Sequence, residues 1–128
     1  MIFDTDIFIF IQRGNVKAAA LVDAETERYL SIQTYMELMQ GANDKAQLRL
    51  TKKYITDMGF SVLPLTENIG HRALIYVEQH TLASGLFAGD AVIAATAVEF
   101  NMALYSANYK HFKVIDELDL RVFKPGRD

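Results

Sequence analysis

The chain has no cysteine, only two prolines, no long hydrophobic run and no excess of positive charge. Without cysteine it can form neither a disulfide framework nor a thiolate zinc site, which agrees with a reducing compartment. No apolar stretch approaches the roughly 18 residues needed to cross a bilayer, and the first ten residues lack the basic start of a signal peptide. We therefore expect a cytoplasmic protein. The net charge of −3 argues against a nucleic-acid binder held by bulk positive charge.

Length and hydrophobic pattern predict one α/β domain over residues 1–128. The 128 residues, 51% of them apolar, suffice for a substantial core, and the sequence contains no linker or repeat. The segment 7–11 is ambiguous between strand and helix, and its polar end favours a helix. Strands are predicted at 1–3, 29–31, 60–65, 103–106 and 120–123, and helices at 15–26, 34–40, 44–57, 66–79 and 90–101. This alternation predicts a central, mostly parallel sheet covered on both faces.

Three carboxylates, Asp4, Glu37 and Asp90, are each embedded in apolar sequence, with no lysine or arginine beside them. An ionised carboxylate is costly to bury unless it is paired or holds a metal. Asp4 follows the first predicted strand and Asn108 follows the strand at 103–106, so both fall on the edge of the sheet where ligands bind. Because Mg²⁺ and Mn²⁺ prefer oxygen ligands, we expect a divalent metal site there.

Each acid also has an ordinary structural interpretation. Asp4 could cap the helix that follows it, and Glu37 could pair with Thr34 in a capping box. Asp90 could be a first-turn acid favoured by the helix dipole. The helix that begins at Asp90 is apolar almost all round, which predicts that it lies in the core with its acid in a sheltered place. That pattern favours a functional site.

Four blocks of sequence follow one another along the chain: Asp4-Thr5, Ser31-x-x-Thr34-x-x-Glu37-Leu38-x-x-Gly41, Asp90-Ala-x-Ile93-Ala-Ala-x-Ala97, and Ser106-x-Asn108-x-x-His111-Phe112. In this order they resemble the motifs of PIN-domain ribonucleases, and most closely those of the VapC-like toxins of type II toxin–antitoxin systems. The likeness spans residues 1 to about 125. It implies a PIN-like three-layer α/β/α sandwich.

The resemblance also implies an activity, a cofactor and partners. It implies an endoribonuclease that depends on Mg²⁺ or Mn²⁺, cleaves RNA phosphodiester bonds and acts as a toxin. A small antitoxin protein and a homodimer are the implied partners. By the same resemblance, Asp4, Glu37 and Asp90 are metal ligands, and Asn108 belongs to the catalytic set in a position where many relatives carry a fourth acid. Because an amide is neutral, we expect Asn108 to hold a second ion only weakly.

The resemblance alone also gives a role to two hydroxyl residues of the blocks. Thr5 and Ser106 would supply hydroxyls that orient the ligands or a water. Ser106-Ala107 departs from the Thr-Arg pair common in the family, which removes a phosphate-contacting arginine. His111 is expected to serve mainly as a structural residue of the turn after Asn108.

Three other functions stay open at this point. The chain could be a PIN-domain nuclease of RNA processing, or an inactive PIN module that binds RNA or metal. Asp4-Thr5-Asp6 also suggests a haloacid-dehalogenase-like phosphatase, although Ala94 stands where that family needs a further aspartate after Asp90. In the nuclease interpretation, Asp6 is expected to be a solvated residue at a helix start or a peripheral ligand of a water.

Two groups of side chains are candidates for contacts with RNA. Four basic residues share one face of the helix predicted over 44–57, which is either a solvated face or a track for phosphates: Lys45, Arg49, Lys52 and Lys53. Three aromatic residues lie close in sequence to the expected ligands and could stack on a base: Tyr35, Phe87 and Tyr109.

Overall fold

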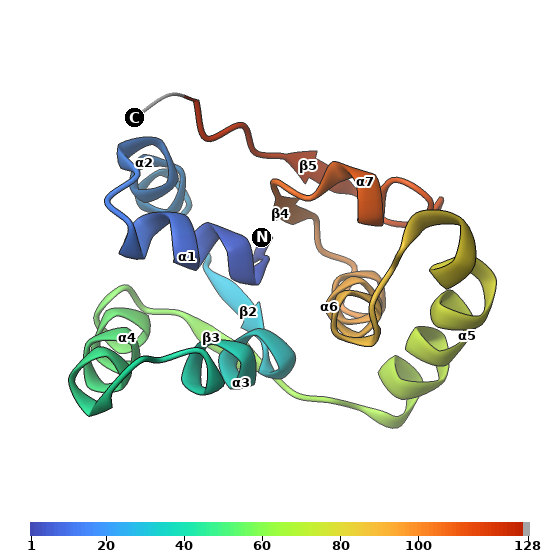
Figure 1. Cartoon of the computed structure of the whole chain (residues 1–128), viewed down its shortest axis with the longest axis horizontal. Helices are drawn as coiled ribbons and strands as arrows, with labels where there is room; N and C mark the ends of the chain where they lie inside the picture. Colours follow the sequence, from blue (N-terminus) through green and yellow to red (C-terminus); the bar gives the residue numbers. More distant parts are fainter. Residues whose placement is uncertain (127–128) are drawn as a thin grey trace.

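The computed structural model describes residues 1–126, in which five strands form one sheet (Figure 1). The strands are β1 (Ile2–Phe3), β2 (Tyr29–Ser31), β3 (Ser61–Leu63), β4 (Leu104–Ser106) and β5 (Leu120–Val122). Their order is β3-β2-β1-β4-β5, and every neighbouring pair is parallel. The predicted sheet is thus confirmed, and it is entirely parallel over these residues. Its central strand is β1, which carries Asp4 at its carboxyl end.

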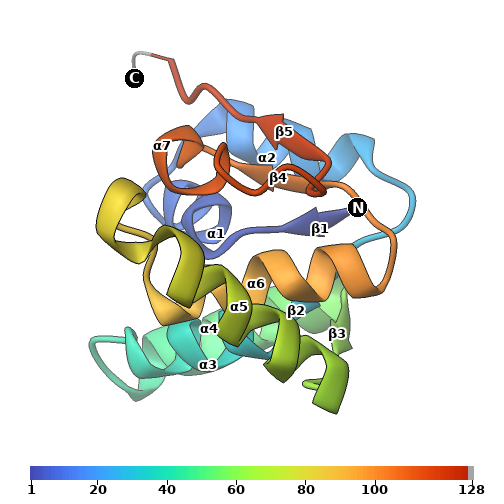
Figure 2. The same ribbon diagram turned by 90° about the vertical axis from the view of Figure 1, so that its right-hand side faces the viewer.

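Helices cover both faces of this sheet. They are α1 (Thr5–Gln12), α2 (Val16–Ala24), α3 (Ile32–Gln40), α4 (Lys45–Asp57), α5 (Glu67–Ser84), α6 (Ala88–Glu99) and the short α7 (Tyr109–Phe112). Helices α1 to α4 lie on one side of the sheet and α5 and α6 on the other (Figures 1 and 2). The ambiguous segment 7–11 is helical, as its polar end favoured. None of the helices within residues 1–126 has the length and apolar character needed to cross a membrane.

Two hydrophobic cores account for the three layers. Consecutive side chains of a strand point to opposite faces, so Ile2 packs with α5 and α6 whereas Phe3 packs with α1 to α4. Both side chains are fully buried. The apolar helix α6 contributes five buried residues to the first core, as the sequence predicted: Ala91, Ile93, Ala94, Ala95 and Ala97. The α/β/α sandwich is therefore confirmed.

The helix starts differ from the prediction in a way that affects the site. Helix α3 begins at Ile32, and its N-cap is Ser31, whose hydroxyl accepts a hydrogen bond from the Thr34 N–H at 3.0 Å. The predicted capping box of Thr34 and Glu37 is therefore wrong, and the Glu37 carboxylate is available for other contacts. Asp4 does cap α1, because its Oδ1 accepts from the Thr5 N–H at 2.8 Å.

The basic face of α4 is exposed to solvent. Lys53 forms an ion pair of 2.6 Å with Asp57 on the same helix. An exposed pair of this kind contributes little to stability. Exposure fits both a solvated face and a track for phosphates, so the two interpretations stay open.

Candidate functional site

Adjacent strand ends bring Asp4 and Ser106 together. In the parallel pair β1 and β4, Phe3 lies opposite Tyr105, so the residues that follow them are neighbours. The buried Ser106 hydroxyl donates to Asp4 Oδ2 at 2.7 Å, while Thr5 N–H binds the other oxygen of Asp4. Asp4 is only 5% exposed. Both oxygens of this buried carboxylate are therefore held in place by donors from two elements.

Asp6 lies in the same place, contrary to the expectation of a solvated residue. Its Oδ2 accepts hydrogen bonds from the Ala107 N–H at 3.0 Å and from the Ser106 hydroxyl at 3.3 Å. Its Oδ1 is buried and has no hydrogen-bond partner among the residues that the structure describes. The cause of the difference is that α1 begins directly after β1, so its first turn faces the end of β4.

Burial and mutual repulsion raise the pKa of these carboxyl groups. Burial raises the pKa of Asp4 to about 8, and the charges of Asp6 and Asp90 act in the same direction. Burial also raises the pKa of Asp6 to about 6, and the charge of Asp90 adds to the effect. Asp4, Asp6 and Asp90 thus interact electrostatically, and we refer to them as the carboxylate cluster. A cation bound between such groups would relieve the repulsion.

Glu37 is connected to the cluster through Thr5. The Thr5 hydroxyl lies 2.5 Å from Glu37 Oε1 and 3.0 Å from the buried Thr34 hydroxyl. The Gln33 amide donates to the other oxygen, Oε2, at 3.0 Å. The backbone N–H of Thr5 binds Asp4, so this one residue contacts both acids. The sequence had linked Thr5 with such an orienting role only by resemblance.

Gly89 is a residue of the site that the sequence reasoning missed. A Cβ atom at this position would lie 2.6 Å from Glu37 Oε2, closer than carbon and oxygen can approach. Glycine therefore allows the first turn of α6, which carries Asp90, to lie against the Glu37 carboxylate. The available sequence signal was a glycine inside the first turn of a helix, which is unfavourable there unless close packing requires it.

Asp90 and Asn108 are linked by His111. The His111 Nδ1 atom lies 3.0 Å from Asp90 Oδ2 and 2.8 Å from the Asn108 amide nitrogen. When Nδ1 carries a proton it donates to Asp90, and when it does not it accepts from Asn108. The structural role expected for His111 is therefore incomplete, because its ring contacts an acid of the cluster. The i, i+3 spacing of Asn108 and His111 was a signal for the contact between these two residues, but no sequence pattern indicated the contact of His111 with Asp90.

The donors present fit a divalent cation in their chemistry. Among residues 1–126, no three acidic or histidine side chains already form a metal-binding arrangement. However, carboxylate oxygens are the ligands that Mg²⁺ and Mn²⁺ prefer, and Asp6 Oδ1 is a buried acceptor to which no residue of 1–126 donates. The raised pKa values of Asp4 and Asp6 likewise indicate that positive charge is lacking there. The cluster could thus hold such an ion and bring it to a phosphate.

Comparison with known proteins identifies the family. The model of the PIN domain family matches residues 1–118. The chain therefore belongs to the PIN domain family, whose members are typically nucleases and generally depend on a metal. This membership speaks against the haloacid-dehalogenase alternative. Comparison of the chain with curated proteins finds no match.

Solved structures similar to this chain come from toxin–antitoxin complexes. A chain of a toxin–antitoxin complex from Klebsiella pneumoniae is 26% identical, with a TM-score of 0.78, and the match covers 99% of this chain and 98% of that one. VapBC2 from Rickettsia felis, bound to a promoter DNA fragment, gives 20% identity, a TM-score of 0.76 and coverage of 97% and 100%. A chain of VapBC-1 from nontypeable Haemophilus influenzae is 24% identical, with a TM-score of 0.76, and the match covers 95% of this chain and 98% of that one. The resemblance to VapC-like toxins is thus confirmed at the level of structure.

Proposed function

We propose that this chain is a divalent-metal-dependent endoribonuclease that acts as the toxin of a toxin–antitoxin pair. The observation that carries the proposal is the carboxylate cluster, in which the described residues supply no donor to a buried Asp6 oxygen and the pKa values of Asp4 and Asp6 are raised. Family membership supports nuclease chemistry. The similarity to chains of toxin–antitoxin complexes supports the toxin role.

Asp4, Glu37 and Asp90 would hold the ion, and Asp6 would add its free oxygen. A bound Mg²⁺ or Mn²⁺ supplies Lewis acidity toward the phosphate and makes a water more acidic. Ser106 and the Thr5 N–H fix the two oxygens of Asp4, so its orientation is set before substrate binds.

Thr5 and Gln33 hold one oxygen each of Glu37. Each oxygen keeps a further lone pair, with which Glu37 can accept a proton from the attacking water. Asn108, whose amide contacts His111, is uncharged and would contribute only weakly to a second ion. The negative charge of the site would therefore come from the carboxylates of Asp4, Asp6, Glu37 and Asp90.

Purified protein should cleave RNA only when a divalent cation is present. The test is to incubate a mixture of structured RNAs with protein in Mg²⁺, in Mn²⁺ and in excess EDTA, and to map the new ends by sequencing. We expect discrete internal cuts with either cation and none in EDTA. Cleavage that persists in EDTA would contradict the metal dependence. RNA binding without any cleavage would instead favour the inactive module, and cuts without an effect on growth would favour RNA processing.

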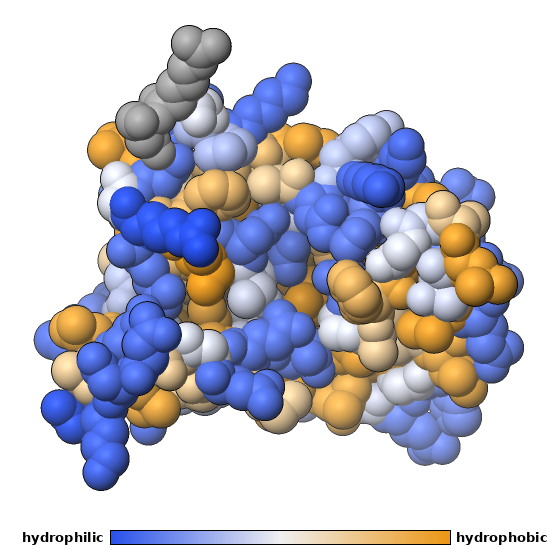
Figure 3. Space-filling view, viewed as in Figure 1, coloured by the Kyte–Doolittle hydropathy of each residue, from blue (hydrophilic) through white to orange (hydrophobic). Residues whose placement is uncertain are grey.

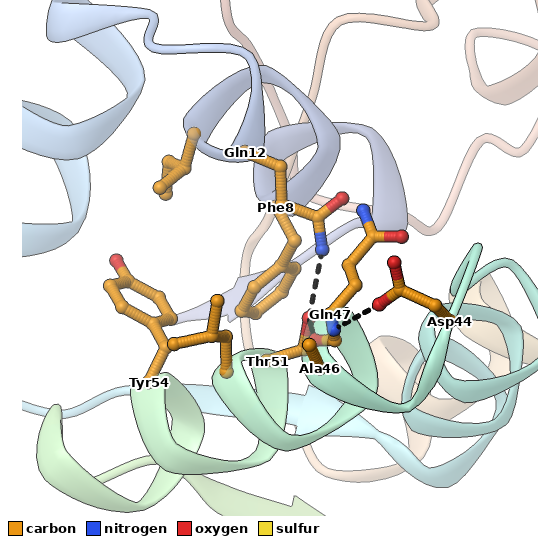
Figure 4. A pocket seen from close by; sticks show the side chains of 9 residues that line it. Phe8, Gln12, Asp44, Ala46, Gln47, Thr51 and Tyr54 are labelled. Carbon is orange, nitrogen blue, oxygen red and sulfur yellow. Dashed lines mark hydrogen bonds between the residues drawn. The ribbon is translucent and has the colours of Figure 1, made fainter.

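A groove between α1 and α4 is the proposed binding place of the antitoxin. It encloses a cavity of about 490 Å³, largely lined by apolar groups from both helices (Figure 4). The amide of Gln12 donates to the Thr51 hydroxyl at 3.1 Å across its floor. Leu50 lines the same groove and is 68% exposed. An apolar face of this kind suits an amphipathic helix or extended segment of a partner.

Co-expression of the proposed antitoxin should restore growth that the chain alone slows. Leu50→Asp should weaken capture of that protein at least about tenfold, because it places a charge in the apolar groove. The matched control is Leu74→Asp on α5, whose exposed hydrophobic residues lie on the right-hand side of Figure 3. Equal affinities of the Leu50→Asp and unaltered proteins, measured by calorimetry, would exclude this groove. The homodimer that the resemblance implies stays a prediction.

A further inference from the structure

The side chain of Phe87 is exposed directly beside the carboxylate cluster. It is 70% exposed, whereas the preceding Leu86 is fully buried and anchors the segment. The Phe87 backbone N–H lies 3.3 Å from Asp90 Oδ2, at the start of α6. This hydrogen bond holds the backbone of Phe87 next to Asp90. Burial in the core does not explain a phenylalanine here, because most of its apolar surface remains in water.

His111 contacts the Phe87 ring from one side. The two ring centroids are 5.6 Å apart and their planes are at 74°, which is an edge-to-face arrangement. The same imidazole lies within hydrogen-bond distance of Asp90. His111 therefore connects the position of the exposed ring to the position of the acid. A ring that touches one neighbour in this way and is largely exposed keeps aromatic surface available for another flat group.

Positive charge lies on the neighbouring helix α7, which also carries His111. Lys113 Nζ is 5.5 Å from the centroid of the exposed Tyr109 ring, and Lys110 is exposed on the same helix. These cations stand close in sequence to the acidic site of a chain whose net charge is −3. Ammonium groups beside an aromatic ring match the alternation of phosphates and bases in a single strand.

We propose that Phe87 is a stacking position for a nucleobase of single-stranded RNA, next to the phosphate that reaches the carboxylate cluster. This inference rests on the proposed nuclease function and names how its substrate is placed. A base in a duplex already stacks on its neighbours, so the position favours unpaired segments such as loops. An aromatic ring accepts any base, so Phe87 sets the placement of the strand rather than its sequence.

The chain contains no tryptophan, which makes a direct test available. Phe87→Trp would introduce a single indole at the proposed position, and Val16→Trp is the matched control. Val16 is 75% exposed at the start of α2, beyond the far end of α1. Each variant is titrated with a ten-nucleotide oligoadenylate and with a ten-unit abasic ribose phosphate chain, in Ca²⁺ to limit cleavage. We expect the oligoadenylate alone to quench the indole fluorescence of the Phe87→Trp variant saturably, and neither chain to quench that of the Val16→Trp variant.

Substitutions that remove the ring should weaken RNA binding without changing metal binding. Phe87→Ala and Phe87→Leu should both raise KM about tenfold and change kcat less than about twofold, while Phe87→Tyr should restore the KM. Calorimetric titration with Mn²⁺ should give the same affinity for all of them. If Phe87→Leu behaves like the unaltered protein, the ring serves only as apolar surface and the proposal is wrong.

The outcomes separate this inference from the proposed function. Quenching of the Phe87→Trp variant by oligoadenylate, in a protein that cuts no RNA, would keep the stacking position and reject the nuclease. Normal cleavage by Phe87→Ala with an unchanged KM would keep the nuclease and reject the stacking position. Fluorescence of the Phe87→Trp variant that responds to the antitoxin and not to RNA would also overturn the proposal, because the ring would then belong to a protein interface.

Discussion

Replacing Asp90 by asparagine should abolish RNA cleavage while the protein stays folded. Asp90 acts electrostatically on both other members of the carboxylate cluster and contacts His111. Loss of an outer partner of a metal ligand typically costs about 10- to 100-fold in activity, so loss of a ligand charge should cost more than about 100-fold. Asparagine keeps the shape and an acceptor oxygen, so the packing of α6 should be unchanged. Asp4→Asn should have the same effect on cleavage.

The measurement is the initial rate of cleavage at saturating Mg²⁺, with folding checked by circular dichroism. Asp23→Asn is the control, because Asp23 is an exposed acid on α2. It should cleave RNA at the unaltered rate. Full activity of purified Asp90→Asn, with contaminating nucleases excluded, would remove Asp90 from the site. A loss of activity in Asp23→Asn as well would show that net charge, and not the cluster, controls the rate.

Sequence reasoning located the edge of the sheet where the site lies, because that edge follows from a general rule. Residues directly after parallel strands gather at one edge, which placed Asp4 and Asn108 there. The hydrogen bond from Ser106, the last residue of β4, to Asp4 was not part of that prediction. Asp6 could not be placed by this rule. A first-turn acid has the pattern of a residue that balances the helix dipole. Its real partner, the Ala107 N–H, is 101 residues away and becomes its neighbour only through the pairing of β1 with β4.

The starts of α3 and α6 show a second limit. Ser31 and Thr34 are both suitable N-caps, and the acid three residues after Thr34 made the wrong one attractive. Gly89 has a role only because α6 lies against Glu37, a contact between helices that local patterns do not encode. Sequence therefore predicts which residues leave a strand or begin a helix better than it predicts which side chains meet across elements.

Without a divalent cation, the protein should become less stable as the pH rises from 5 to 8. The folded-state pKa of Asp4 is raised to about 8 by burial, against an ordinary value of 3.8. Between these values the folded chain binds a proton at Asp4 that the unfolded chain has released, so unfolding becomes easier as the pH rises. Asp6, with a pKa raised to about 6, acts in the same direction over the lower part of the range. We expect Tm in EDTA to fall by at least about 5 °C.

Two comparisons test whether Asp4 and the lack of a cation cause the fall of Tm with pH. Asp4→Asn has no proton to lose at that position, so its Tm in EDTA should be higher than that of the unaltered protein at pH 8 and should fall less with pH. Saturating Mn²⁺ favours the ionised cluster, so it should raise the Tm of the unaltered protein more at pH 8 than at pH 5. Both comparisons use thermal denaturation from pH 5 upward. The pKa values of Glu117 and Asp119 are lowered in the folded chain, so these two groups change the stability with pH only below this range. A Tm that rises with pH in EDTA, or equal slopes for the Asp4→Asn and unaltered proteins, would mean that Asp4 is ionised in the folded chain without any cation.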